Sequence, residues 1–229
     1  MYQYSVALAV YDYIPILLSA IGLYYLTKAL QTWHPPIASS ASLAAALIVA
    51  GGLCKATWKL LISTMDVNVM ALNHALMLFM APGFILLTWC VWTTRRYYAN
   101  RPTSPTSWRC PASTIATLLI VVVVLALQFP DKRLWFFALL GALTLSNIIF
   151  AWHAVRHSWQ TANKGAAILY LLNVIAVFAM SGLARVGDNS ESFQWIAQLS
   201  NTVTQGLFAG AGYLLWKARS PQQNFQYQS

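Results

Sequence analysis

Residues 118–127 read LLIVVVVLAL, an apolar stretch without a polar side chain. Residues 121–124 are consecutive valines, so apolar and polar residues do not alternate as they would in a membrane β-barrel strand. In lipid, each backbone N–H and C=O group needs a partner within its own segment, and a helix provides one. The stretch therefore predicts a transmembrane helix.

The rest of the 229-residue chain has the same character, because 59% of its residues are apolar and 8% are charged. A soluble domain carries about 25% charged residues, so this chain could not cover a water-facing surface. Disorder requires low hydrophobicity and is excluded. Gly (11) and Pro (9) are too scarce for a collagen-like or low-complexity chain. The composition predicts an integral membrane protein.

A helix needs about 20 mostly apolar residues to cross a bilayer, and several segments meet or approach that length. Breaks at Pro35-Pro36, Pro130-Asp131 and residues 187–190 help to separate them. We expect an all-α bundle of seven transmembrane helices, forming one domain over 1–219, and a short polar tail over 220–229. The N-terminus lacks the basic region of a signal peptide, so the first segment should stay in the mature protein. The predicted helices cover approximately 5–30, 37–62, 67–92, 113–129, 134–155, 165–183 and 192–216.

The distribution of charge predicts the orientation. With the N-terminus outside, nine Lys and Arg fall on the interior side and three in exterior loops, while all five acidic residues lie toward the exterior. Cytoplasmic loops of membrane proteins are enriched in Lys and Arg, so we expect the N-terminus outside and the C-terminus in the cytoplasm. The interior group is Lys28, Arg95, Arg96, Arg101, Arg109, Arg156, Lys164, Lys217 and Arg219.

The third and seventh predicted helices resemble each other. One reads Asn73, Phe79, Trp89 and the other Asn201, Phe208, Trp216, with one residue of offset. This is compatible with a 3+1+3 plan, in which two parallel three-helix repeats are joined by a linker helix. Chance similarity between two Leu/Ala-rich helices is the other interpretation.

Polar residues within the helices share a depth. At about 1.5 Å per residue, Asp12 lies roughly 10 Å below the outer end of its helix, and four more polar side chains reach a similar level. Ionisable groups cost about 2.5–3.5 kcal/mol each inside a bilayer, so they should face the bundle interior. We expect Asp12 and Lys55 to form an ion pair, which either binds a ligand or only fixes helix packing. The other members of this layer are Asn73, His74 and Gln198.

The last predicted helix carries Gln194, Gln198, Asn201 and Gln205, spaced so that they share one face. Primary amides donate and accept hydrogen bonds, so this stripe either binds a polar ligand or joins neighbouring helices. The sixth helix adds Asn173 and Arg185 on one face, although Arg185 could simply extend to the interface.

Cofactor signals are few. His153 and His157 are four residues apart and either hold a metal or are ordinary interfacial histidines. The three cysteines form no C-x-x-C pair and predict neither a disulfide nor a metal site. Microbial rhodopsins also have seven helices, but their retinal needs a lysine midway along the last helix, where this chain has Asn201 and Gln205. We therefore expect no cofactor, and no retinal.

Three functions remain open from the sequence. The first is a transporter or sensor that binds a small molecule or ion in an outward-facing polar pocket. The second is an intramembrane enzyme acting on a lipid or isoprenoid, with His74 and an acid, Asp12 or Asp66, as proton-transfer pair. The third is an accessory membrane subunit without chemistry. The absence of hydrolase and phosphate-loop motifs makes catalysis the less favoured interpretation.

The partners expected from the sequence are lipid and a small ligand. The basic loop over 95–110 should contact anionic lipid or a cytoplasmic partner. The formal charge of +9 follows from membrane topology, so we expect no nucleic acid. A plasma membrane or a bacterial inner membrane is the expected location.

Overall fold

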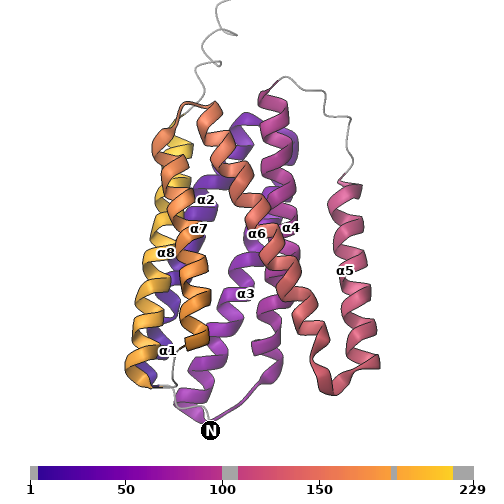
Figure 1. Ribbon diagram of the computed structural model, residues 1–229, viewed down its shortest axis with the longest axis vertical. Coiled ribbons are helices and arrows are strands. Elements are labelled where there is room, and N and C mark those ends of the chain that lie inside the picture. Colours follow the sequence, from indigo (N-terminus) through magenta and orange to yellow (C-terminus); the bar gives the residue numbers. More distant parts are fainter. Residues whose placement is uncertain (1–4, 100–107, 187–189, 219–229) are drawn as a thin grey trace, which may run out of the picture.

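The computed structural model describes residues 5–99, 108–186 and 190–218, and Figure 1 shows them as a bundle of long helices. Within these ranges there are seven long helices and one short one, α1 (Val6–Tyr11). The long helices are α2 (Tyr13–Trp33), α3 (Ala38–Met65), α4 (Met70–Tyr98), α5 (Arg109–Gln128), α6 (Leu134–Gln160), α7 (Lys164–Val186) and α8 (Glu191–Lys217). Short 3-10 turns, Pro35–Ile37 and Pro130–Lys132, precede α3 and α6.

Six spans of the described chain, from α1–α2 to α7, are long and apolar enough to cross a membrane. The predicted all-α membrane bundle is therefore confirmed. The helix α8 is as long as its neighbours, but it is not among these six spans, because its amide side chains lower its mean hydropathy. The predicted third and fifth helices, 67–92 and 134–155, end too early, because α4 and α6 continue past the apolar segment to Tyr98 and Gln160.

The first predicted helix, 5–30, is interrupted at Asp12. Proline has no N–H group, so Pro15 cannot bond to the carbonyl of Tyr11 four residues earlier. The helix is assigned in two pieces, α1 and α2, and Asp12 is the single residue between them. This irregularity places a carboxylate inside the bundle near one of its ends.

Six of the long helices form a closed ring in chain order. Helix α2 packs on α3, α3 on α4, α4 on α6, α6 on α7, α7 on α8, and α8 returns to α2. Helix α5 lies outside the ring and packs on α6 and α4 (Figure 1). This position of α5 is the one expected for the linker helix of a 3+1+3 plan. The common origin of the repeats stays a prediction.

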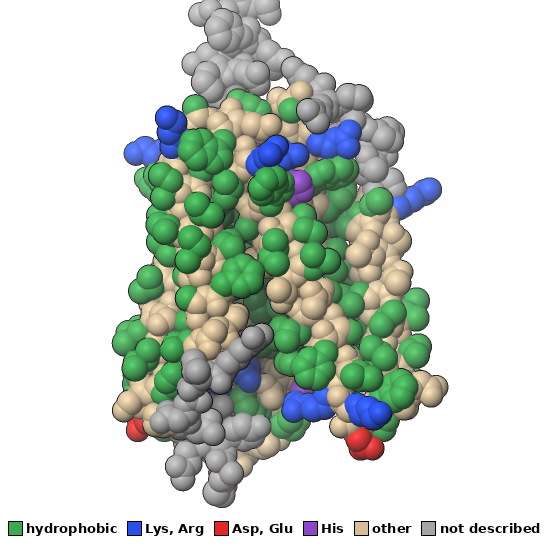
Figure 2. Space-filling model, in the orientation of Figure 1, with side chains coloured by type: hydrophobic (Ala, Val, Ile, Leu, Met, Phe, Trp, Pro, Cys, Tyr) green, Lys and Arg blue, Asp and Glu red, His purple; other side chains and the backbone are tan. Residues whose placement is uncertain are grey.

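The two ends of the bundle differ in charge. At one end, called here the basic end, lie Arg95 and Arg96 of α4, Arg109 of α5 and Lys217 of α8. The opposite end, the acidic end, carries Asp66, Asp131 and Glu191. Figure 2 shows most of the Lys and Arg side chains of this face at the top, and the acidic side chains at the bottom beside a smaller number of basic ones. By the positive-inside rule, the basic end is predicted to face the cytoplasm.

Glycines allow two pairs of helices to approach closely. A Cβ atom at position 212 on α8 would lie 2.6 Å from the carbonyl oxygen of Gly22 on α2, and one at Gly22 would lie 2.5 Å from the ring of Phe208. Between α3 and α4, a Cβ atom at Gly83 would lie 2.7 Å from Ile48. Small residues at such crossings let helix backbones touch, which is how helices associate in lipid.

The closure between α2 and α8 gives the first testable prediction. We expect Gly212→Ala to lower the free energy of unfolding by about 1–3 kcal/mol, because the added methyl group would push the two backbones apart. The matched control is Gly206→Ala on the same helix, where a Cβ atom meets nothing within 4 Å. This control should be neutral, or stabilising by up to about 1 kcal/mol. Thermal unfolding in detergent measures both, and equal midpoints would contradict the prediction.

Candidate functional site

A polar cavity of about 290 Å³ lies inside the ring, toward the acidic end. Its charged lining residues are Asp12, Lys55 and Lys59, and α8 adds the amide side chains of Gln198, Asn201 and Gln205. These residues come from the α1–α2 break, from α3 and from α8. The structure thus brings Asp12, Lys55 and Gln198, expected at one depth, into one cavity.

The Asp12 carboxylate forms an ion pair with Lys59, not with Lys55 as the shared depth suggested. The Lys59 Nζ lies 2.6 Å from Asp12 Oδ2, and the Asp12 side chain is 8% exposed. Helix α3 is antiparallel to α2, and Lys59 is one turn nearer the acidic end than Lys55, so it reaches the carboxylate first. The second carboxylate oxygen, Oδ1, is buried and accepts no hydrogen bond.

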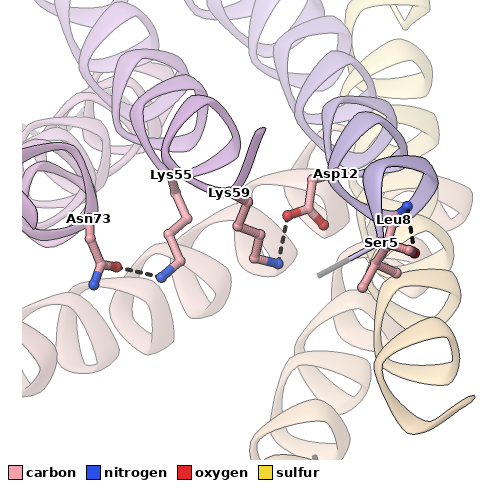
Figure 3. Close-up of polar contacts among 6 residues, drawn as sticks. All are labelled: Ser5, Leu8, Asp12, Lys55, Lys59 and Asn73. Atoms are coloured by element: carbon pink, nitrogen blue, oxygen red, sulfur yellow. Dashed lines mark hydrogen bonds and ion pairs between the residues drawn. The ribbon is translucent and has the colours of Figure 1, made fainter. Parts of the chain in front are cut away.

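Lys55 reaches in the other direction, toward α4. Its ammonium group donates a hydrogen bond to Asn73 Oδ1 and lies 4.1 Å from the centre of the Trp58 ring. Figure 3 shows the two lysines leaving the same helix for different partners, Lys59 for Asp12 and Lys55 for Asn73. Within the described residues, these two contacts of Lys55 are with neutral groups, although the charge of Lys55 also acts on Asp12.

Three of the four amides predicted to form a stripe on α8 face the cavity. Gln198, Asn201 and Gln205 line it, and Gln205 Nε2 donates to Asn201 Oδ1 at 3.4 Å. Gln194, one turn nearer the acidic end, is half-buried and lies outside the lining. The stripe therefore faces the interior of the ring rather than lipid.

A second cavity, of about 400 Å³, continues from the first between α6 and α7. The two share Asn201, Gln205 and three other lining residues, so they form one bent space inside the ring. The second part is mostly apolar, with Asn147 and Asn173 among its polar side chains. Asn173 Nδ2 also donates to the Thr204 carbonyl at 2.8 Å, so this amide joins α7 to α8 as well as lining the cavity.

An aromatic cluster closes the space toward the basic end. On each of the four helices, the aromatic residue is three or four positions away from a residue that lines the cavity. In every case it is displaced toward the basic end. The Phe150 and Phe208 ring centres are 6.1 Å apart, and those of Tyr170 and Phe208 are 6.0 Å apart. Sequence analysis missed this cluster, although an Asn or Gln lies three residues from each of Phe150, Tyr170 and Phe208 in the sequence. Its members are Phe84, Phe150, Tyr170 and Phe208.

His74 is separated from the charged cavity. Its ring packs edge-on against Trp135 of α6 at 4.9 Å, and neither cavity includes it in its lining. Its partner Trp135 belongs to α6, whereas Asp12 lies against α3. The geometry therefore gives no support to a proton-transfer pair of His74 and Asp12. The side chain of Arg185, near the end of α7, lies outside the described residues.

The two histidines of α6 lie near the basic end. His157 is fully buried between the rings of Trp33, at 4.5 Å, and Tyr98, at 5.7 Å. Within residues 5–99, 108–186 and 190–218, no three His, Cys, Asp or Glu side chains gather as a metal site would require. The contacts of the His157 ring are with the aromatic rings of Trp33 and Tyr98. Residues 100–107, which are half of the segment 95–110 where a lipid or partner contact was expected, lie outside the described residues.

Comparisons with known protein families, curated proteins and solved structures found no match for this chain.

The Asp12–Lys59 pair gives the second prediction. Removing one member of a buried ion pair leaves the other charge uncompensated, which destabilises a protein by about 3 kcal/mol. We expect Asp12→Asn and Lys59→Met each to lower the free energy of unfolding by about that amount. The double variant should lose less than the sum of the two, because neither member of the pair is left without its partner.

Denaturant unfolding of the four proteins in detergent measures the coupling between these residues. Asp131→Asn is the control, since Asp131 is exposed in the turn before α6 and should change stability little. Strictly additive effects of Asp12→Asn and Lys59→Met would contradict the coupling.

Proposed function

We propose that this chain is a carrier that binds a small molecule in the central cavity and moves it across the membrane. The observation that carries the proposal is a polar cavity inside a ring of helices, with aromatic side chains packed across the ring on the basic side of that cavity. A carrier needs a central site that is accessible from one side at a time. The present arrangement corresponds to a state that faces the acidic end.

The chemistry of the lining supports a binding role. Amide side chains offer both donors and acceptors, and they avoid the desolvation penalty of additional charges. Gln198, Asn201 and Gln205 follow one another along α8, so a ligand could keep hydrogen bonds while it moves along the cavity. Asn147 and Asn173 continue this polar surface into the second part.

The ring offers two places where its halves could move. One half consists of α2–α4 and the other of α6–α8, and they meet at the α2–α8 and α4–α6 contacts. Pro82 lies inside α4 and removes one backbone hydrogen bond from it, which weakens the helix beside the cavity residue Met80. Separating Phe84 on one half from Phe150 on the other would open the space toward the basic end.

Cysteine accessibility tests the proposal. Ser19 lines both parts of the cavity, so we expect Ser19→Cys, in a chain with Cys54, Cys90 and Cys110 replaced by Ala, to react with a membrane-impermeant thiol reagent. A carrier exposes its site alternately, so the reaction should occur in both right-side-out and inside-out vesicles. Adding Phe208→Ala should speed the reaction from the basic side several-fold by weakening the aromatic closure.

The matched control is Leu17→Cys, two residues away on α2. Leu17 is 61% exposed and should face lipid, so this cysteine should not react from either side. Reaction of Ser19→Cys from the acidic side alone, even with Phe208→Ala, would contradict transport and favour a receptor. No reaction from either side would contradict a water-accessible cavity.

A further inference from the structure

The second part of the cavity reaches the lipid-facing surface of the bundle. Helices α6 and α7 lie together near the basic end and diverge toward the acidic end, where α3 is visible between them (Figure 1). Figure 2 shows this face hollowed in the same place, with a basic side chain visible inside. Two residues of the cavity wall, Ile148 on α6 and Phe178 on α7, are 42% and 51% exposed. The hollow between these helices is thus a side opening toward the bilayer.

The two parts of the space differ sharply in chemistry. All the charged lining residues lie in the first part, where two ammonium groups face one carboxylate. The second part is bounded mostly by apolar side chains, among them Leu143, Met180 and Phe178. A ligand that fills both parts would have one charged end and one apolar end.

The charge balance selects the sign of the charged end. Asp12 is paired with Lys59, which leaves Lys55 in contact with the neutral groups of Asn73 and Trp58. A positive charge in a low-dielectric site is costly without an anion, and one bound negative charge would balance the cavity. A cationic head would add a second uncompensated charge.

We propose, on the basis of the carrier function above, that the ligand is an amphipathic monoanion. Its head lies at Lys55, its apolar chain occupies the space between α6 and α7, and it enters sideways from the bilayer through the opening beside Phe178. Charge-assisted hydrogen bonds are about twice as strong as neutral ones, so the head supplies selectivity and the chain supplies hydrophobic binding energy.

Photolabelling in lipid nanodiscs tests this assignment. The probe is a long-chain alkyl sulfonate with a diazirine midway along its chain, because a sulfonate keeps its single charge at all relevant pH values. Alkyl alcohol and alkyl trimethylammonium probes with the same chain are the matched neutral and cationic comparisons. We expect the sulfonate to label peptides over 140–148 and 173–181, and the other two to label them about tenfold less.

Two variants test separately the anionic head at Lys55 and the entry of the apolar chain between α6 and α7. Lys55→Gln should reduce the sulfonate labelling of these peptides about tenfold, whereas Lys132→Gln, an exposed lysine at the acidic end, should leave it unchanged. Ser181→Phe should also reduce it, because a large side chain at this lining position would obstruct the side opening while keeping every charge. Unfolding midpoints of the variants show whether they remain folded.

Each outcome bears on the assignment. Selective labelling that depends on both Lys55 and Ser181 supports it. Equal labelling by the alcohol, or labelling unaffected by Lys55→Gln, overturns the anionic head. No sulfonate labelling of α6 and α7 overturns the amphipathic ligand. The reactivity of Ser19→Cys is measured without any ligand, so it tests the carrier function separately from this assignment.

Discussion

The contact between the first and last long helices, α2 and α8, determines most of what this structure can do. It depends on Gly22 and Gly212, where no Cβ atoms separate the two backbones. In lipid there is no hydrophobic driving force between apolar helices, so their association depends on van der Waals contacts between closely packed surfaces. Because this contact joins the first and the last of the six successive helices, it closes them into a ring. Without the ring, the polar side chains of α2, α3 and α8 would face lipid.

Once the ring is closed, its interior is the place where polar groups can be accommodated. Charged and uncharged polar side chains occupy different places in this interior. Asp12 and Lys59 satisfy each other, Lys55 relies on an amide and an aromatic face, and α8 contributes uncharged donors and acceptors. On the basic side of the cavity, the rings of Phe150, Tyr170 and Phe208 pack against one another across the interior. The cavity therefore ends at an aromatic layer on that side.

Sequence reasoning predicted the helices and the depth of their polar residues, because length, apolarity and rise per residue are nearly independent of tertiary structure. It could not predict rotation about each helix axis. In a membrane bundle both lipid and protein interior are apolar, so most helix faces look alike in sequence. For this reason the partner of Asp12 was assigned one turn too far, at Lys55, and His74 was grouped with residues that it does not join. Where one face differed strongly, as on α8, the prediction of a shared face agrees with the structure for Gln198, Asn201 and Gln205, which line the cavity, but Gln194 lies outside the lining.

The helix α8 also shows how folding and binding depend on each other in this protein. Among the long helices of the described residues, it is the one that is not apolar enough to span a membrane by itself, yet it closes the ring and lines the cavity. Its amides avoid lipid because α2 and α7 cover its flanks, and Asn173 fixes it to α7 through the Thr204 carbonyl. The side chains that disfavour its insertion are therefore the ones that make the cavity polar. The stability of such a bundle depends on contacts between helices rather than on the apolarity of each helix. Polar residues can therefore be accommodated in the interior.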